Sequence, residues 1–292
     1  MLFNSIDFAV FLPLVFILFW FVTNRSLNLQ NIFIVCTSYL FYAWWDYRFL
    51  ALIALSTLVD FWVAKALKNE EKQKRRVYLL VLSLFVNLGM LGFFKYFNFF
   101  IDSWVDAWHF FGINLETSTL KIILPVGISF YTFQTLSYTI DVYRKKIEPT
   151  HSLVQFAAFV SFFPQLVAGP IERASQLLPQ FSKQRVFNSK MAMSGFYLII
   201  WGLFKKMVVA DNCAFFVNQI FDGNLNLSSL ELFLGAVLFG FQIYCDFSGY
   251  SDIAIGVARL FGFSLMTNFS FPYFSRDIAE FWRRWHISLT EW

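Results

Sequence analysis

The chain has 292 residues, of which 58% are hydrophobic and only 14% are charged, with a formal net charge of +4. A soluble domain is about 45–50% apolar and about 25% charged, so this composition excludes an ordinary water-soluble protein. The small, dispersed positive charge gives no indication of a nucleic-acid partner. The composition therefore predicts an all-α, polytopic membrane protein with lipid around much of its surface.

Apolar stretches near the length of a membrane crossing recur along the chain. The N-terminus lacks the basic region and cleavage site of a signal peptide, so the first stretch is expected to be a retained span. Several stretches are short and must tilt, re-enter or be buried, so we expect seven or eight crossings. The predicted apolar segments are 8–22, 31–45, 49–66, 77–100, a short amphipathic piece 101–111, then 122–143, 153–168, 195–217, 230–245 and 250–263.

Basic residues cluster between the predicted spans, which is how membrane orientation is set. Residues 65–76 are rich in Lys and Arg, and three predicted spans precede them, so the N-terminus is predicted to lie outside. The segment 153–168 lies between two further basic stretches, 144–146 and 173–190. It is therefore expected to re-enter the membrane rather than cross it, with Pro164 breaking any helix there.

Small and charged residues recur within the apolar stretch 241–263. These positions are Asp246, Gly249, Asp252, Gly256 and Arg259. Their spacings of 3, 3, 4 and 3 put them on one face of a helix, where glycine allows close approach of a second helix. Charges at membrane depth face the protein interior or a water-filled cavity. This face is therefore either a structural ion-pair network or the lining of a substrate path, to which Ser248 and Tyr250 would also contribute.

The segment 275–292 is amphipathic, and its apolar spacing predicts one helix at the membrane surface or against a cavity wall. His286 lies on the border of the apolar stripe, about 40° from Trp282. This position suits a neutral imidazole acting as a base, and equally an interfacial packing residue. His109 and His151 are expected in loops. The three cysteines have no paired spacing, so neither a disulfide framework nor a metal site is predicted.

Longer motifs run along the whole chain in a consistent order. They include MLFNSIDFAVFLPLVFILFW, GISFYTFQTLSYTIDVYR, FFPQLVAGPIERASQLLPQF, YCDFSGYSDIAIGVARLFGF and FWRRWHISLTEW. Together they resemble the membrane-bound O-acyltransferase family, in its branch of alginate and peptidoglycan O-acetyltransferases. The resemblance implies one membrane domain over residues 1–292, built as a ring-like bundle around a funnel in the bacterial inner membrane.

The resemblance also implies a reaction. The family moves an acyl group from a cytoplasmic thioester, such as acetyl-CoA, toward hydroxyls of an extracytoplasmic polysaccharide, with a periplasmic acetyltransferase as partner and no bound cofactor. It implies an active-site role for His286, in the W-R-R-W-H motif, and a second histidine in a later helix as the base. No histidine follows His286, so we expect this sequence to be a fragment or a truncated gene, and incomplete as an enzyme.

The leading hypothesis is therefore an O-acyltransferase in which His286 orients the substrate or the missing base. Asp246, Ser248, Tyr250 and Asp252 are the candidates for shaping the path, with Arg259 on the same face. One alternative is a transporter or exporter subunit that uses this face as a substrate or proton route, although the inverted repeats of such proteins are not seen. A second alternative is a non-catalytic membrane scaffold that binds an acyl-carrying partner.

Overall fold

The computed structural model describes residues 1–112, 123–166, 169–223 and 227–292, and the regular structure in these residues is helical, which confirms the all-α prediction. The helices are α1 (Ile6–Val22), α2 (Leu27–Asp46), α3 (Leu50–Asn69), α4 (Gln73–Phe110), α5 (Ile128–Tyr143), α6 (Leu153–Ser161), α7 (Phe163–Leu166), α8 (Ala174–Leu177), α9 (Ser189–Leu203), α10 (Asp211–Gly223), α11 (Ser229–Leu260), α12 (Ile278–Arg284) and α13 (Ile287–Glu291).

Four helical stretches of the described chain are long and apolar enough to cross a membrane: Leu27–Asn69, Gln73–Phe110, Ser189–Asp222 and Ser229–Leu260. The first comprises α2 and α3, joined by the 3-10 turn η1 (Tyr47–Phe49). The apolar helices α1 and α6–α7 are shorter. The chain is thus an integral membrane protein, although the described residues do not contain all of the seven or eight predicted crossings as separate long helices.

Two predicted boundaries are wrong. Residues 101–111 do not form a separate amphipathic piece, because α4 continues without a break to Phe110. The predicted gap between residues 245 and 250 is also absent, because α11 runs continuously from Ser229 to Leu260. Its polar side chains find partners on neighbouring elements, so they do not interrupt the helix.

The predicted segment 153–168 is broken, as expected for a re-entrant element. α6 ends at Ser161, Phe162 adopts a non-helical conformation, and α7 is a single turn containing Pro164, while residues 167–168 lie outside the described residues. α5 begins only at Ile128, after Gly127 at φ +77°, and residue 122 of the predicted span lies outside the described residues as well. A Cβ on Gly127 would lie 2.4 Å from the Leu166 carbonyl oxygen, so this glycine seats α5 against α7.

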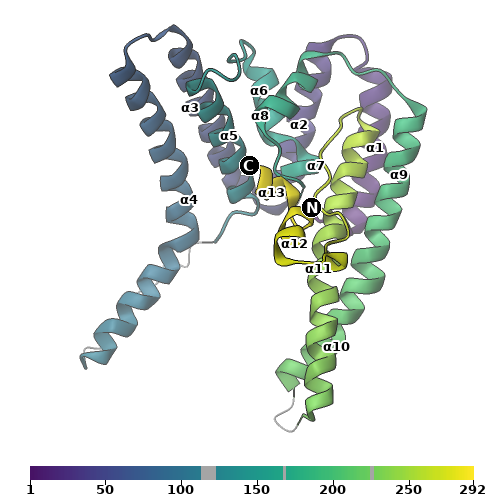
Figure 1. Ribbon diagram of the computed structural model, residues 1–292. Coiled ribbons are helices and arrows are strands. Elements are labelled where there is room, and N and C mark those ends of the chain that lie inside the picture. The colour runs from purple at the N-terminus through teal and green to yellow at the C-terminus, as the bar shows by residue number, and fades with distance from the viewer. Residues whose placement is uncertain (113–122, 167–168, 224–226) are drawn as a thin grey trace.

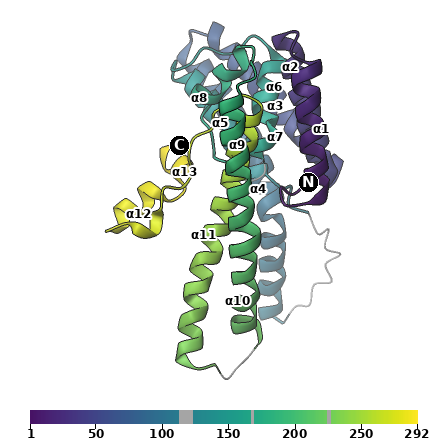
Figure 2. The ribbon, with the colours of Figure 1, turned by 90° about the vertical axis from the view of Figure 1, so that its right-hand side faces the viewer.

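Figures 1 and 2 show how these helices are arranged. Most of the helices stand side by side in the upper part of the view, which we call the shared layer: α1, α2, α3, α5, α6 and the upper parts of α4, α9 and α11. The lower part of α4, and α10 with the lower part of α11, project below this layer. The short helices α12 and α13 lie near the centre of the view in Figure 1. Aromatic rings form much of the core of the shared layer, including Phe19, Phe41, Phe163 and Phe261.

α9 and α11 approach each other through glycine, as the spacing in α11 predicts. A Cβ on Gly256 would lie 2.5 Å from the Gly195 carbonyl oxygen, and one on Gly202 would lie 2.6 Å from the Gly249 carbonyl oxygen. Real Cβ atoms do not come so close to backbone oxygen. The two helix backbones therefore touch at two levels, which fixes the polar face of α11 against its neighbour.

Replacing Gly256 by alanine is expected to destabilise the protein by about 1–3 kcal/mol, because the added methyl group forces the two backbones apart. The matched control is Gly89→Ala in α4, where nothing lies within 4 Å of the added Cβ. That variant is expected to be neutral or slightly stabilising, since alanine is the better helix former. Thermal unfolding of the detergent-solubilised protein, followed by circular dichroism, measures both. Equal unfolding temperatures for the two variants would contradict the close packing of α9 on α11.

Candidate functional site

The chain after α11 is not the single amphipathic helix expected over residues 275–292. It forms two short helices, α12 and α13, and His286 lies between them at φ 48° and ψ 53°. This left-handed conformation is uncommon for a residue other than glycine and cannot continue a right-handed helix. The break removes His286 from the predicted helical stripe and leaves its side chain to be placed by local contacts.

Aromatic side chains dock the segment that carries His286 onto α11. Ring centroids of Phe247 and Phe269 lie 5.1 Å apart, and those of Phe269 and Trp285 are also 5.1 Å apart. The imidazole of His286 meets the Phe247 ring edge-on, at 4.8 Å and 86°. An edge-to-face pair of this kind stabilises the contact by about 0.5–1.5 kcal/mol beyond the gain from burying the rings. His286 therefore lies directly against α11 and is about half-buried.

Asn268 organises the contacts of His286. It is 1% exposed, and its side-chain Oδ1 lies 3.0 Å from His286 Nδ1, 2.9 Å from Ser288 Oγ and 3.3 Å from the Ser288 backbone nitrogen. Its Nδ2 donates to Ser251 Oγ of α11 at 3.1 Å, and its carbonyl oxygen accepts from the Ile287 nitrogen at 2.9 Å. One buried amide thus ties α13, the imidazole and α11 together.

This arrangement fixes the protonation of the ring. The Ser288 backbone N–H can only donate, so the atom of Asn268 that it meets is the oxygen, which can only accept. Nδ1 of His286 must then carry a proton, so in the neutral ring Nε2 is the nitrogen with the lone pair. Burial lowers the pKa of His286 below its ordinary value of 6.5. The neutral form of the imidazole is therefore favoured at pH 7, and in that form Nε2 is the basic nitrogen.

Two adjacent lysines pair with the polar face of α11. They lie in the π-helical segment η3 (Phe204–Ala210), which joins α9 to α10. Lys205 Nζ lies 2.7 Å from Asp252 Oδ2 and donates to Ser248 Oγ at 3.0 Å. Lys206 Nζ lies 2.6 Å from Asp246 Oδ1. Both carboxylates of the predicted path are thus also members of an ion-pair network between helices.

The remaining predicted site residues face other partners. Lys206 Nζ also pairs with Asp211 at 2.7 Å and lies 5.5 Å from the centre of the Tyr250 ring. The Tyr250 hydroxyl contacts Asn4 Oδ1 at 3.3 Å, before α1. Arg259 donates to Ser194 Oγ of α9 at 2.7 Å. Within the described chain, no hydrogen bond or ion pair joins these groups directly to His286.

The contacts of His286 and those of Lys205 lie on neighbouring faces of α11. Phe247 and Ser251 are one turn apart and hold the segment of His286 and Asn268. Ser248 and Asp252, each one residue further along, hold Lys205. The imidazole and the buried lysine therefore flank the same two turns of α11, although they do not touch.

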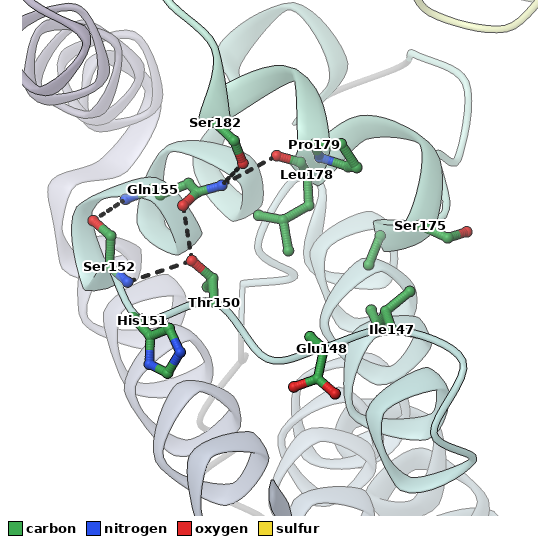
Figure 3. Close-up of a pocket in the computed structure, with 11 residues that line it drawn as sticks. Ile147, Glu148, Thr150, His151, Ser152, Gln155, Ser175, Leu178, Pro179 and Ser182 are labelled. Carbon is green, nitrogen blue, oxygen red and sulfur yellow. Dashed lines mark hydrogen bonds between the residues drawn. The ribbon is translucent and has the colours of Figure 1, made fainter.

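A pocket of about 500 Å³ lies elsewhere, between the α5–α6 connection and the segment formed by α8 and the 3-10 turn η2 (Leu178–Ser182) (Figure 3). Gln155 spans it, accepting from Thr150 Oγ1 at 2.8 Å and donating to Ser182 Oγ at 2.6 Å. His151 is exposed at its edge in a loop, as expected, whereas His109 lies in the last turn of α4. None of the predicted site residues lines this pocket, so it is separate from the site around His286.

Sequence reasoning missed Asn268, Lys205 and Lys206. The lysines carried a signal, because two adjacent charges inside an apolar stretch need buried partners. Asn268 carried none, since a lone asparagine in a polar segment is common. The described residues contain no group of three or more His, Cys, Asp or Glu side chains arranged to hold a metal ion.

Comparison with known proteins gives consistent matches. The model of the membrane-bound O-acyltransferase family matches residues 144–292. A probable alginate O-acetylase of Pseudomonas aeruginosa is 41% identical over 100% of this chain and 55% of its own length. A peptidoglycan O-acetyltransferase of Helicobacter pylori is 35% identical over 99% of this chain and 60% of its own. A teichoic acid D-alanyltransferase of Streptococcus thermophilus is 31% identical, over 65% and 50% respectively. The chain thus spans little more than half the length of the first two relatives.

Proposed function

Because the chain belongs to the membrane-bound O-acyltransferase family, we propose that it carries out acyl transfer within the bacterial inner membrane, with its N-terminus outside. The donor is acetyl-CoA or another acyl thioester on the cytoplasmic side. The acceptor is a hydroxyl of an extracytoplasmic polysaccharide such as alginate or peptidoglycan, reached with the help of a periplasmic acetyltransferase. The names of the relatives, which act on alginate, peptidoglycan and teichoic acid, support this class of acceptor.

The observation that carries the proposal is the imidazole of His286, whose Nδ1 donates to Asn268 and whose Nε2 therefore keeps its lone pair in the neutral ring. In acyl transfer the acceptor oxygen attacks the thioester carbonyl carbon and loses its proton. The carbon–sulfur bond then breaks, and the thiolate leaves and takes up a proton. A neutral imidazole nitrogen can take the hydroxyl proton or orient the group that does so. Exclusion of water by the membrane protects the activated acyl group from hydrolysis.

Asp246, Ser248, Tyr250, Asp252 and Arg259 are proposed to shape the route to this imidazole rather than to react. Their support is positional. Ser248 and Asp252 lie one residue beyond the two α11 residues that hold the His286 segment. Lys205 and Lys206 of η3 pair with Asp252 and Asp246 of α11, and these ion pairs fix the position of α11 along one side of the proposed route.

Transfer and transport can be separated with the full-length protein reconstituted in vesicles. Acetyl-CoA labelled in its acetyl group is supplied on one side, and a hydroxyl-bearing glycan together with the periplasmic acetyltransferase on the other. We expect label to appear on the glycan only when protein and donor are both present. Glycan flux that needs no donor would favour a transporter. Binding of a periplasmic partner without any labelling would favour a scaffold.

A further inference from the structure

Glu172 is a buried carboxylic acid outside the predicted site. It is 1% exposed and lies in the stretch that leads into α8. No basic side chain pairs with it in the described part of the chain. Glu291 of α13 is near enough to repel it, and the neighbouring Arg173 directs its guanidinium to the Trp292 carbonyl oxygen instead. A buried acid without a cation requires another explanation for its position.

The carboxyl group of Glu172 holds the backbone that leads to Asn268. Its Oε1 accepts from the Met266 backbone nitrogen at 2.5 Å. Two residues earlier, Ser264 exchanges two hydrogen bonds with the Gln180 side chain, both 2.9 Å long. Two residues later, Asn268 holds His286 Nδ1. The stretch 264–268 is thus fixed at its start by Gln180, at its middle by Glu172 and at its end by the imidazole and Ser251.

We propose that Glu172 is the positioning residue of His286: its carboxylate fixes the Met266 amide, and gain of a proton loosens the stretch through which Asn268 holds the imidazole. The inference deepens the proposed function, since it rests on the active-site role of His286. It assigns Glu172 no contact with the substrate.

The direction of the pH effect follows from the surroundings of Glu172. Burial raises the pKa of its carboxyl group to about 7, the Met266 amide opposes this shift, and the charge of Glu291 adds to it. The group is therefore ionised above about pH 7 and neutral below. A charged acceptor binds an N–H more strongly than a neutral one does. The hydrogen bond from the Met266 amide to Glu172 is therefore stronger above pH 7 than below, and the stretch that leads to Asn268 and His286 is held more tightly there.

The test is the rate at which diethyl pyrocarbonate modifies His286 in the full-length protein in membranes, followed by mass spectrometry from pH 6.5 to 8.5. Only the neutral imidazole reacts, so protonation of His286 itself can only lower its rate at the acid end, which is opposite in sign to the change expected from Glu172. Free N-acetylhistidine in the same solution, corrected for its own protonation, calibrates the reagent at each pH. Asn268→Ala, which frees the imidazole directly, serves as the positive control and should raise the rate.

In the wild type we expect the corrected rate to fall about fivefold as the pH rises through 7, the effect of strengthening one hydrogen bond. Glu172→Gln keeps an oxygen for the Met266 amide but cannot ionise, so its rate should be flat with pH and close to the low-pH value. Glu172→Ala should match or exceed that value. The exposed Glu71→Gln should retain the wild-type inflection. A wild-type inflection that persists in Glu172→Gln overturns the proposal. The modification rate of His286 does not depend on acyl transfer. A failure of the proposed function would therefore be distinguishable from a failure of the role proposed for Glu172.

Discussion

Replacing His286 by alanine is expected to lower acetylation of the polysaccharide by about 10²–10⁴-fold, the usual contribution of a positioned acid–base group. The neutral ring, with Nδ1 bound to Asn268, leaves Nε2 as the basic atom of the site. Alanine removes that atom and leaves the buried Asn268 oxygen without one of its donors. The measurement is the acetyl content of extracellular polysaccharide in an acetylation-deficient host that expresses the full-length protein, normalised to the amount of protein in the membrane.

The sharper variant is His286→Asn, because it separates proton transfer from orientation. Asparagine tolerates the left-handed backbone found at residue 286, whereas alanine adds strain there. Its amide nitrogen can still donate to Asn268, but it offers no basic nitrogen. We expect His286→Asn to be as inactive as His286→Ala if the imidazole accepts the proton. Activity close to wild type would reassign His286 to orienting the substrate or another base.

The control for both variants is His151→Ala, which removes an exposed imidazole beside the separate pocket. It should leave acetylation unchanged and so exclude a general effect of losing a histidine. Full activity of His286→Ala at normal expression would remove the central residue of the proposed site. In that case the ion-pair face of α11 would be the remaining candidate for function.

The sequence predicted the face of α11 well, for a simple geometrical reason. Residues spaced by three and four positions must share one side of any helix, whatever its surroundings. The structure places Gly256 against Gly195, Asp252 against Lys205 and Arg259 against Ser194, all from α9 or η3. A pattern that depends on local periodicity can be read without knowing the fold.

The placement of His286 could not be read in this way. The apolar spacing over residues 275–292 runs through the position where the helix breaks, and no glycine or proline marks it. The break depends on long-range contacts, chiefly Asn268 to Ser251 and Phe247 to the imidazole. The boundary at α4 was missed for a related reason, because a change in composition near residue 100 does not end a helix that lacks a stop signal.

The second large effect is expected at the ion pair between buried Lys205 and partly buried Asp252. Lys205 is 8% exposed, and its Nζ lies 2.7 Å from the carboxylate. Lys205→Met leaves Asp252 without its counter-charge between two helices, which is expected to cost about 3–5 kcal/mol of stability. Asp252→Asn alone should cost a similar amount by leaving the lysine unpaired. The double variant should recover most of the loss, because two neutral side chains need no counter-charge.

Thermal unfolding of the four proteins in detergent gives the coupling energy of the pair. Lys68→Met provides the surface comparison, because the Lys68–Glu148 pair has side chains 38% and 82% exposed and is expected to be worth at most about 1 kcal/mol. Strictly additive losses at Lys205 and Asp252 would show that the two residues do not stabilise each other.

The same double variant decides between the two interpretations of the α11 face, which the pairing alone leaves open. A carboxylate that only balances Lys205 becomes dispensable once the lysine is neutral, so a stable double variant should then acetylate polysaccharide normally. A carboxylate that also lines the route to His286 is needed for its own charge and shape. We expect the second result, a protein with near-normal unfolding but reduced transfer, because Ser248 and Asp252 lie one residue beyond the α11 residues that hold the imidazole. Normal transfer by the stable double variant would instead assign the face of α11 to helix packing alone.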